Sequence, residues 1–361
     1  MSALKKHTID GDFAMLRGVI HSPSIAYETW GELNAGRDNC VLIFTGLSPS
    51  AHACSSTEDT STGWWEDMIG PAKPIDTNRY FVICVNSLGS CFGSTGPASI
   101  DPTTGEHYRL KFPVLTVEDI AKSSGHVLDA IGVDHVHTVV GSSMGGMTAL
   151  AFTLVYPGRS RRLVTISSAA RSLPFSIALR SVQREIIRED PAWANGNYDL
   201  EGPGPVTGMR LARKLGMITY RSSAEWAERF GRERATDPAP GDHPFGIDFE
   251  VESYLEAHAN RFIGSFDANC YLYLSRAMDL FDAADHGGSL EASFRDLGLE
   301  AALVIGVETD FLFPITQQEE IAIALDKHVA DVRFRRMASL QGHDSFLVDM
   351  DRFRPALAEF F

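Results

Sequence analysis

The sequence predicts a doubly wound α/β fold, a mostly parallel sheet with helices on both faces, interrupted by a helical insertion. Short β-branched runs alternate with longer helical patterns over residues 1–172 and return over residues 299–361. Over residues 173–298, strand signals almost vanish and helical patterns dominate. We therefore expect one core made of two parts, 1–172 and 299–361, with residues 173–298 forming a helical lid.

The expected strands are near-continuous apolar runs, which is typical of strands buried on both faces of a sheet. They lie at residues 41–45, 80–86, 137–141, 163–167, 301–307 and 332–336. A helix is expected at 117–131, where apolar residues recur at helical spacing. A closing helix is expected after the last strand, with one apolar face marked by Phe346, Leu347, Met350, Phe353, Leu357 and Phe360. Polar breaks rich in Gly and Pro divide the lid at 195–208 and 237–246.

Composition excludes several classes of protein. The chain has 361 residues and 47 Asp+Glu against 32 Lys+Arg, so its net charge of −15 disfavours duplex nucleic acid as a partner. Its apolar runs are too short to span a membrane, and its N-terminal stretch lacks the apolar core of a secretory signal. Five scattered cysteines without CxxC spacing indicate reduced thiols and no metal site. We expect a cytoplasmic protein without a membrane partner.

Residues 141–145, Gly-Ser-Ser-Met-Gly, form the sharpest local signal. They follow an expected strand and open an expected helix, which is the setting of a nucleophilic serine on a tight turn. Such a turn strains the serine and needs small neighbours. Ser143 is therefore the candidate nucleophile, and the N–H of Met144 is the candidate oxyanion donor. The alternative is a Gly-rich turn with an incidental serine.

A serine nucleophile needs a base, which in turn needs a carboxylate to orient it. His343 follows the last expected strand and Asp310 follows the strand before it, so both lie at the edge of the sheet that carries Ser143. His343 is the candidate base and Asp310 the candidate carboxylate. Asp331 and Asp344 are nearby alternatives to Asp310.

With these residues the chain resembles the homoserine O-acetyltransferase family, of α/β-hydrolase fold. The matching segments are residues 141–146, Gln183-Arg184, 190–193, 212–220, Thr309-Asp310 and 342–344. The resemblance implies transfer of an acyl group from acyl-CoA to an amino-acid hydroxyl through an acyl-Ser143 intermediate. It also implies that Arg213 and Asp344 bind the carboxylate and ammonium of the acceptor. It further implies a homodimer joined through the lid and no cofactor, with acyl-CoA as cosubstrate.

The loop after the first core strand departs from the homoserine acetyltransferases. Its segment Gly46-Leu47-Ser48-Pro49 looks like that of the serine O-succinyltransferase branch, and is also similar to serine O-acetyltransferases of the same fold. In the succinyl branch this segment is linked to acceptor choice, and an arginine matching Arg180 to acyl-CoA choice. The second oxyanion N–H is expected from Phe44 or Leu47.

Positive charge gathers at the start of the lid. Residues 159–221 contain eleven basic and five acidic side chains, a net charge of +6. Guanidinium groups suit an anionic acyl-CoA and the second carboxylate of a succinyl group, although a solvated helix face would have the same composition. We expect a serine O-succinyltransferase of cysteine biosynthesis. The alternatives are a serine or homoserine O-acetyltransferase and, more remotely, a non-catalytic hydrolase-fold binding protein.

Overall fold

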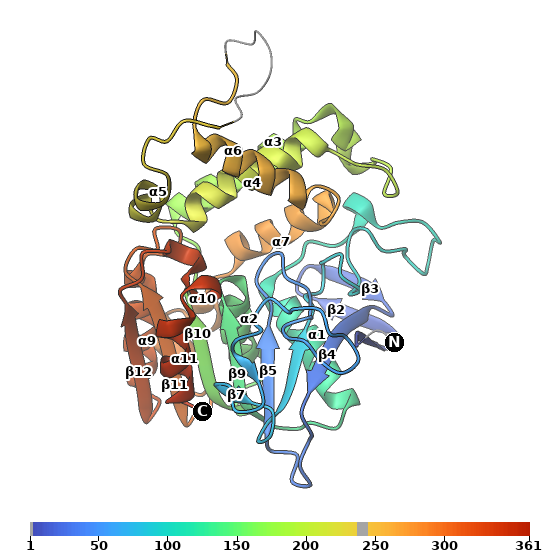
Figure 1. Cartoon of the computed structure of the whole chain (residues 1–361). Coiled ribbons are helices and arrows are strands. Elements are labelled where there is room, and N and C mark those ends of the chain that lie inside the picture. Colours follow the sequence, from blue (N-terminus) through green and yellow to red (C-terminus); the bar gives the residue numbers. More distant parts are fainter. Residues whose placement is uncertain (1–2, 237–244) are drawn as a thin grey trace.

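A computed structural model describes residues 3–236 and 245–361, and a mostly parallel eight-stranded sheet forms the centre of this described part (Figure 1). The strand order is β1-β4-β8-β5-β9-β10-β11-β12. At one edge of the sheet, β1 (Lys5–Thr8) pairs antiparallel with β4 (Ser24–Trp30), which in turn pairs antiparallel with β8. The parallel strands are β8 (Phe81–Val85), β5 (Cys40–Phe44), β9 (Val136–Ser142), β10 (Ser160–Ile166), β11 (Ala301–Val307) and β12 (Asp331–Met337).

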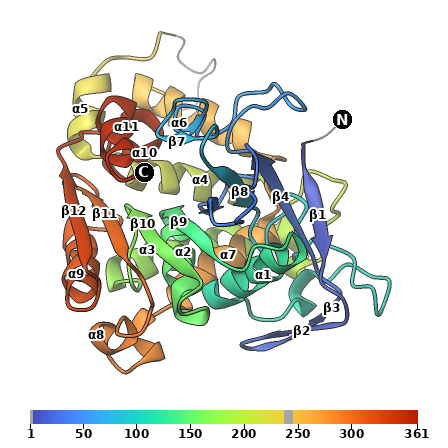
Figure 2. The ribbon, with the colours of Figure 1, turned by 90° about the horizontal axis from the view of Figure 1, so that it is seen from below.

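Apolar side chains cover both faces of this sheet. Along β5, Leu42 and Phe44 pack into one core cluster, while Val41 and Ile43 pack into the other. The first cluster includes residues of α1 (Val117–Ala130), α2 (Met144–Val155) and α9 (Ile315–Asp326). The second includes residues of α10 (Ser345–Val348) and α11 (Met350–Ala358), on the opposite side of the sheet (Figure 2). Helices thus cover both faces of the sheet.

Between β10 and β11, the described residues form helices joined by loops and contribute no strand to the sheet. It contains α3 (Pro174–Arg188), α4 (Val206–Tyr220), α5 (Ser223–Phe230), α6 (Glu250–Phe262), α7 (Ala268–Leu280) and α8 (Leu290–Ser293). In Figure 1, α3, α4 and α6 form a layer above the sheet, and α7 lies between that layer and the strands. The break expected at 237–246 falls largely outside the described residues. We refer to these helices as the lid.

The six strands expected from the sequence are confirmed to within three residues at each end, and so is the helix at 117–131. Strands β1 and β4 and helix α9 were not expected from the sequence. Two small sheets were not expected either, β2 (Asp12–Met15) with β3 (Gly18–His21) and β6 (Ile69–Gly70) with β7 (Ile75–Asp76).

The expectation of a single closing helix is wrong. Helices α10 and α11 are separated at Asp349, whose φ of −100° and ψ of 60° lie outside the helical region. Phe346, Phe353 and Leu357 still pack into the same core cluster, because the apolar face continues across the break.

None of the helices described is long and apolar enough to cross a bilayer.

Candidate active site

Ser143 occupies a strained turn between β9 and α2. Its φ is 55° and its ψ is −124°, a conformation that side chains with a Cβ rarely adopt. Hydrogen bonds hold it in place: its N–H donates to Ile166 O at 2.9 Å, and its carbonyl accepts from Ser168 Oγ at 2.8 Å. The side chain is only partly buried, so the hydroxyl remains accessible at the edge of the sheet.

Three glycines leave room for this turn. A Cβ on Gly141 would overlap the carbonyl of Gly145, and a Cβ on Gly145 would overlap the carbonyl of Phe44. A Cβ on Gly146 would overlap the side chain of Ser168. The turn therefore requires glycine at positions that the sequence motif marks.

The structure brings Ser143, His343 and Asp310 into one hydrogen-bonded chain. His343 Nε2 lies 2.8 Å from Ser143 Oγ, and His343 Nδ1 lies 2.7 Å from Asp310 Oδ2. The other carboxylate oxygen of Asp310 accepts from the N–H groups of Leu312, at 3.0 Å, and Phe313, at 2.9 Å. This is the arrangement of a nucleophile, a base and the carboxylate that orients the base.

The two other carboxylates that the sequence left open have different partners. Asp331 begins β12 and pairs with Arg333 at 2.7 Å. Asp344 Oδ2 lies 3.4 Å from Arg221 Nε. Neither is hydrogen-bonded to His343 in the described residues, so Asp310 is the carboxylate beside the base.

Opposing effects set the basicity of His343. Burial lowers the pKa of its imidazole, while the charge of Asp310 and its hydrogen bond raise that pKa, and the net direction is upward. The imidazolium that forms when the base takes a proton is therefore stabilised by Asp310.

A second hydroxyl ties the loops of Asp310 and His343 together. Thr309 Oγ1 donates to Ser339 O at 2.6 Å and accepts from Gly342 N at 3.2 Å. Gly342 has a φ of 67° and its missing side chain leaves room for the backbone at Ser222. The lid thus touches the loop that carries the base.

A pocket opens directly above Ser143, between the sheet edge and the lid. The lid contributes Leu179, Arg180 and Gln183 from α3, Tyr220 from α4, and Tyr271 and Met278 from α7. The core contributes the whole predicted acceptor segment 46–49, together with Trp64, Leu312, Phe313, Asp344, Phe346 and Leu347. A substrate at Ser143 would therefore be enclosed by the lid helices.

The two candidates for the second oxyanion donor lie in different surroundings. Phe44 ends β5, is fully buried and packs against Phe152 in the core. Leu47 is partly exposed and lines the pocket beside Ser143. Met144 begins α2, so its N–H belongs to the positive end of that helix. Of the two candidates, Leu47 is the one that lines the pocket.

Arg180 lines the pocket, and it is already paired. Its Nε donates to Asp279 Oδ1 at 2.6 Å and its Nη2 donates to Ser172 Oγ at 2.5 Å. Arg184 Nη1 lies 2.7 Å from the other oxygen of Asp279. Two guanidinium groups therefore share one carboxylate, which leaves one positive charge at this wall.

The rest of the basic segment does not form a continuous cationic face. Arg210 and Lys214 both contact Glu256, and Arg171 contacts Glu320 at 2.5 Å. These carboxylates lie outside residues 159–221, so the local count of +6 overstated the charge available to a ligand. The charge that remains near the pocket belongs to Arg180 with Arg184 and to Arg213.

The two predicted acceptor-binding residues are placed differently. Asp344 lines the pocket, and burial raises the pKa of its carboxyl group. Arg213 does not line the pocket; its guanidinium lies 4.5 Å from the ring centre of Phe262. No carboxylate pairs with Arg213 in the part of the chain that the structure describes, and its buried Nε has no hydrogen-bond partner there. A nearby guanidinium is thus free for an anion.

Several pocket residues were not assigned a role from the sequence. Tyr271 and Met278 come from α7, which carries no recognised motif. The same helix supplies Asp279, the partner of Arg180. Trp64 lies 15 or more residues beyond the acceptor segment 46–49, and only the structure brings it to the pocket. Among the described residues, no cluster of three or more His, Cys, Asp or Glu is arranged to hold a metal ion.

Comparisons with known proteins agree with this architecture. Residues 39–349 match the alpha/beta hydrolase fold family. A curated serine O-succinyltransferase from Litchfieldella anticariensis is 58% identical over 98% of this chain and 96% of its own length, and one from Stenotrophomonas maltophilia is 54% identical over the same shares. The crystal structure of homoserine O-acetyltransferase from Bacillus anthracis has a TM-score of 0.89 and 29% identity, covering 100% of this chain and 98% of that one. Esterase E22 has a TM-score of 0.87 and 27% identity, covering 99% of both chains.

Proposed function

The chain belongs to the alpha/beta hydrolase fold family and, within it, to the serine O-succinyltransferases, and from this premise we propose that it transfers a succinyl group from succinyl-CoA to the hydroxyl of L-serine. The observation that carries the proposal is the likeness to curated serine O-succinyltransferases over 98% of the chain. The product would be an activated serine on a route to cysteine. A cytoplasmic location remains a prediction from the sequence.

The acylation step uses the hydrogen-bonded chain at Ser143. His343 takes the hydroxyl proton while Ser143 Oγ attacks the thioester carbonyl, and the protonated base then gives its proton to the leaving CoA thiolate. Asp310 holds the imidazole and stabilises its cation. The N–H groups of Met144 and Leu47 would stabilise the oxyanion.

The second step returns the acyl group to a hydroxyl. His343 takes the proton of the serine hydroxyl, whose oxygen attacks the acyl-Ser143 ester, and Ser143 regains its proton as the ester breaks. Transfer requires that the amino acid reach the ester in preference to water. The lid residues of α3, α4 and α7 that line the pocket support this role.

Charge around the pocket supports the choice of substrates. The positive charge that Arg180 and Arg184 share over Asp279 would attract the free carboxylate of a succinyl group. Asp344 would bind the acceptor ammonium and Arg213 its carboxylate, with residues 46–49 shaping the space for the side chain. The acyl-CoA is the cosubstrate, and the steps above use only residues of this chain.

We also propose a homodimer joined through the lid. Four apolar side chains of the packed helices α3 and α4 are exposed: Phe175 at 56%, Val182 at 46%, Leu211 at 40% and Ile218 at 45%. Exposed apolar side chains on one surface are typical of a contact with another protein. A second copy of this chain would cover them and would brace the lid.

A matrix of donors and acceptors tests the reaction. Succinyl-CoA and acetyl-CoA are each incubated with L-serine or L-homoserine, and CoA release and the acylated amino acid are measured. We expect the succinyl-CoA and L-serine pair to have the highest kcat/KM. A higher value for homoserine with acetyl-CoA would reject the proposal, and so would turnover that no amino acid affects.

The likeness to esterase E22 makes hydrolysis the second outcome to measure. Ser143→Ala should abolish both acyl-enzyme formation, followed by intact mass, and turnover. Full turnover in that variant would reject the covalent route for transferase and esterase alike. It would favour the binding-protein alternative only if the wild type were inactive as well.

A further inference from the structure

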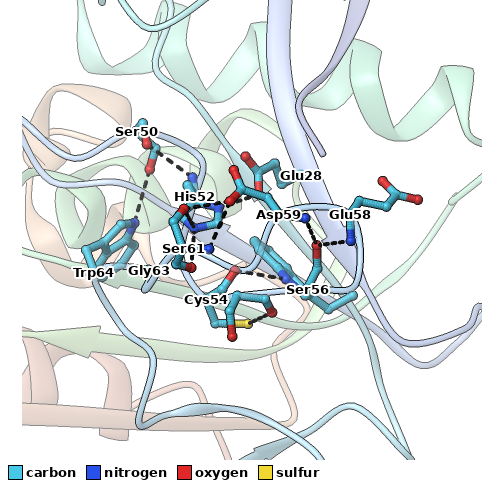
Figure 3. Close-up of polar contacts among 12 residues, drawn as sticks. Glu28, Ser50, His52, Cys54, Ser56, Glu58, Asp59, Ser61, Gly63 and Trp64 are labelled. Atoms are coloured by element: carbon cyan, nitrogen blue, oxygen red, sulfur yellow. Dashed lines mark hydrogen bonds and ion pairs between the residues drawn. The ribbon is translucent and has the colours of Figure 1, made fainter. Parts of the chain in front are cut away.

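A histidine on the loop that forms the predicted acceptor side of the pocket pairs with a buried glutamate, and Figure 3 shows the two side chains with their polar contacts. Glu28 stands on β4 with 4% exposure, and His52 follows the acceptor segment 46–49 by three residues. His52 Nδ1 lies 2.9 Å from Glu28 Oε2. The proposed mechanism uses neither residue.

The hydrogen bonds of His52 require a cation. His52 Nε2 lies 2.9 Å from the carbonyl oxygen of Ser61 and 3.1 Å from its hydroxyl. That hydroxyl donates to Asp59 Oδ1 at 2.6 Å, so it accepts from the ring. A carbonyl and a carboxylate can only accept, and therefore both ring nitrogens donate, which only an imidazolium can do.

The charged groups around the ring agree with this assignment. Burial lowers the pKa of His52, but the hydrogen bonds to Glu28 and Ser61 and the negative charge of Asp59 raise it, and the net direction is upward. The thiols beside Glu28 are neutral, because burial raises the pKa of Cys54 to about 12 and that of Cys84 well above its ordinary value. The network thus holds one cation between the carboxylates of Glu28 and Asp59.

Hydrogen bonds connect His52 to the wall of the pocket. Its backbone N–H donates to Ser50 Oγ at 3.2 Å, and its carbonyl accepts from Trp64 N at 3.3 Å. The indole of Trp64 donates to Ser50 O at 3.0 Å. Trp64 and Pro49, the neighbour of Ser50, both line the pocket above Ser143.

A second anchor on β4 holds the far end of the same segment. Trp30 Nε1 donates to Cys54 O at 3.2 Å. Glu28 and Trp30 lie two residues apart on one face of the strand, so the rigid sheet fixes the segment at His52 and at Cys54.

We propose that the ionised His52–Glu28 pair is a positioning device for the acceptor side of the active site. It holds residues 49–50 and Trp64 in the shape that binds the amino acid. The inference rests on the proposed function, since that function assigns the acceptor to this wall. When the imidazolium loses its proton, one ring nitrogen faces an acceptor without a hydrogen to donate, and the segment loses an anchor. The proposed acylation of Ser143 uses Leu47 of the neighbouring segment, but neither residues 49–50 nor Trp64.

The variants His52→Gln and Glu28→Gln test the device. We expect the KM for the amino-acid acceptor to rise about tenfold, the loss typical of one charged hydrogen bond. The rate at which succinyl-CoA acylates Ser143, followed by intact mass before acceptor is added, should stay within about twofold of wild type. A merely structural role would change the acceptor KM and the acylation rate together.

The pH dependence supplies a second readout. In wild type the acceptor KM should rise as the pH increases through the raised pKa of His52, because the cation is lost above that pKa. This rise should disappear in His52→Gln, whereas the titrations of Asp344 and of the acceptor amine would remain in both proteins. The same rise in the variant as in wild type would overturn the proposal.

His286→Gln is the matched control. His286 Nε2 lies 3.3 Å from Glu118 Oε1, in a histidine–glutamate pair that does not line the pocket. This variant should leave the acceptor KM unchanged. An equal effect in the control and in His52→Gln would reject the positioning role.

The outcomes separate this inference from the proposed function. If the wild type prefers another donor or acceptor, the proposed function fails and the KM test proceeds with the preferred amino acid. If the wild type only hydrolyses thioesters, or His52→Gln does not fold, the wild-type imidazole is titrated by NMR. A pKa of His52 at or below the ordinary value for histidine would then reject the device, and a raised pKa with both ring nitrogens protonated would support it.

Discussion

Ser143 keeps a backbone conformation that is costly for a residue with a side chain, and neighbouring hydrogen bonds supply the compensation. Bonds from Ser143 N to Ile166 and from Ser168 to Ser143 O fix the turn on both sides. The hydroxyl therefore points at His343 before any substrate arrives, and little reorganisation is needed for attack.

The protonation of His343 predicts the acid limb of the pH profile. The neutral form of His343 is lost as the pH falls through the pKa of this residue, which is raised above its ordinary value. We expect the acylation rate to fall about tenfold per pH unit below that midpoint. Single-turnover acylation across pH measures it. In Asp310→Asn the midpoint should move to lower pH, and an unmoved midpoint would contradict Asp310 as the source of the shift.

Arg180 should decide between donors. Arg180→Leu removes the guanidinium nearest the pocket and leaves Asp279 paired with Arg184. We expect kcat/KM for succinyl-CoA to fall about tenfold more than that for acetyl-CoA, because only the succinyl group carries a second carboxylate. Arg184→Leu is the comparison variant: Arg184 shares Asp279 but does not line this pocket, so its loss should discriminate between the donors less than the loss of Arg180. Equal losses for both donors would count against the role of Arg180.

At the scale of elements, the junction of β5, β9 and α2 places the nucleophile. Phe44 of β5 pairs with Gly141 of β9, and its carbonyl lies against Gly145 at the start of α2. The helix can approach the two strands this closely only because these positions lack side chains. The same approach brings the Met144 N–H to the sheet edge.

Gly145→Ala should therefore destabilise the whole core. The new methyl would overlap backbone atoms of Phe44 and Thr45, which cannot rotate away. We expect the free energy of unfolding to fall by about 3 kcal/mol, the upper range for overpacking a core. Urea unfolding measures it. Gly36→Ala serves as the control, because a Cβ there meets only ordinary contacts and should change stability by less than about 0.5 kcal/mol. Similar stabilities for the two variants would contradict a tight junction.

At the scale of the molecule, the lid and the core complete one pocket between them. Ser143, His343 and Asp310 belong to the core, while Arg180, Tyr220 and Tyr271 belong to lid helices. The base loop touches the lid directly at Gly342. Changes in lid packing should therefore reach the catalytic residues.

The exposed face of α3 and α4 predicts the oligomeric state. Val182→Glu combined with Ile218→Glu would bury two charges in the proposed dimer contact, so we expect the dimer to dissociate. Light scattering coupled to size-exclusion chromatography measures the mass. Ile323→Glu, at a residue 60% exposed on α9, is the matched control and should leave the mass unchanged. A wild type that is monomeric at micromolar concentration would reject the proposed interface.

The sequence by itself determined the features that depend on local geometry. The glycines around Ser143 indicate a turn that only small residues can form. Strands buried on both faces of the sheet are recognisable as apolar runs in the sequence. The order of Ser143, Asp310 and His343 after successive strands placed them at one sheet edge, because parallel strands end on the same side. Strand β4 was missed, since it carries Glu28 among apolar residues.

Only the tertiary structure decided which charges meet. Asp279 lies 99 residues from Arg180, and Glu28 lies 24 residues from His52. Patterns of neighbouring residues in the sequence therefore predict neither ion pair. Net charge counted along a segment failed for the same reason, because Glu256 and Glu320 reach the basic residues from elsewhere in the chain. Electrostatic energy depends on distance in space, whereas turn and strand signals depend on distance along the chain.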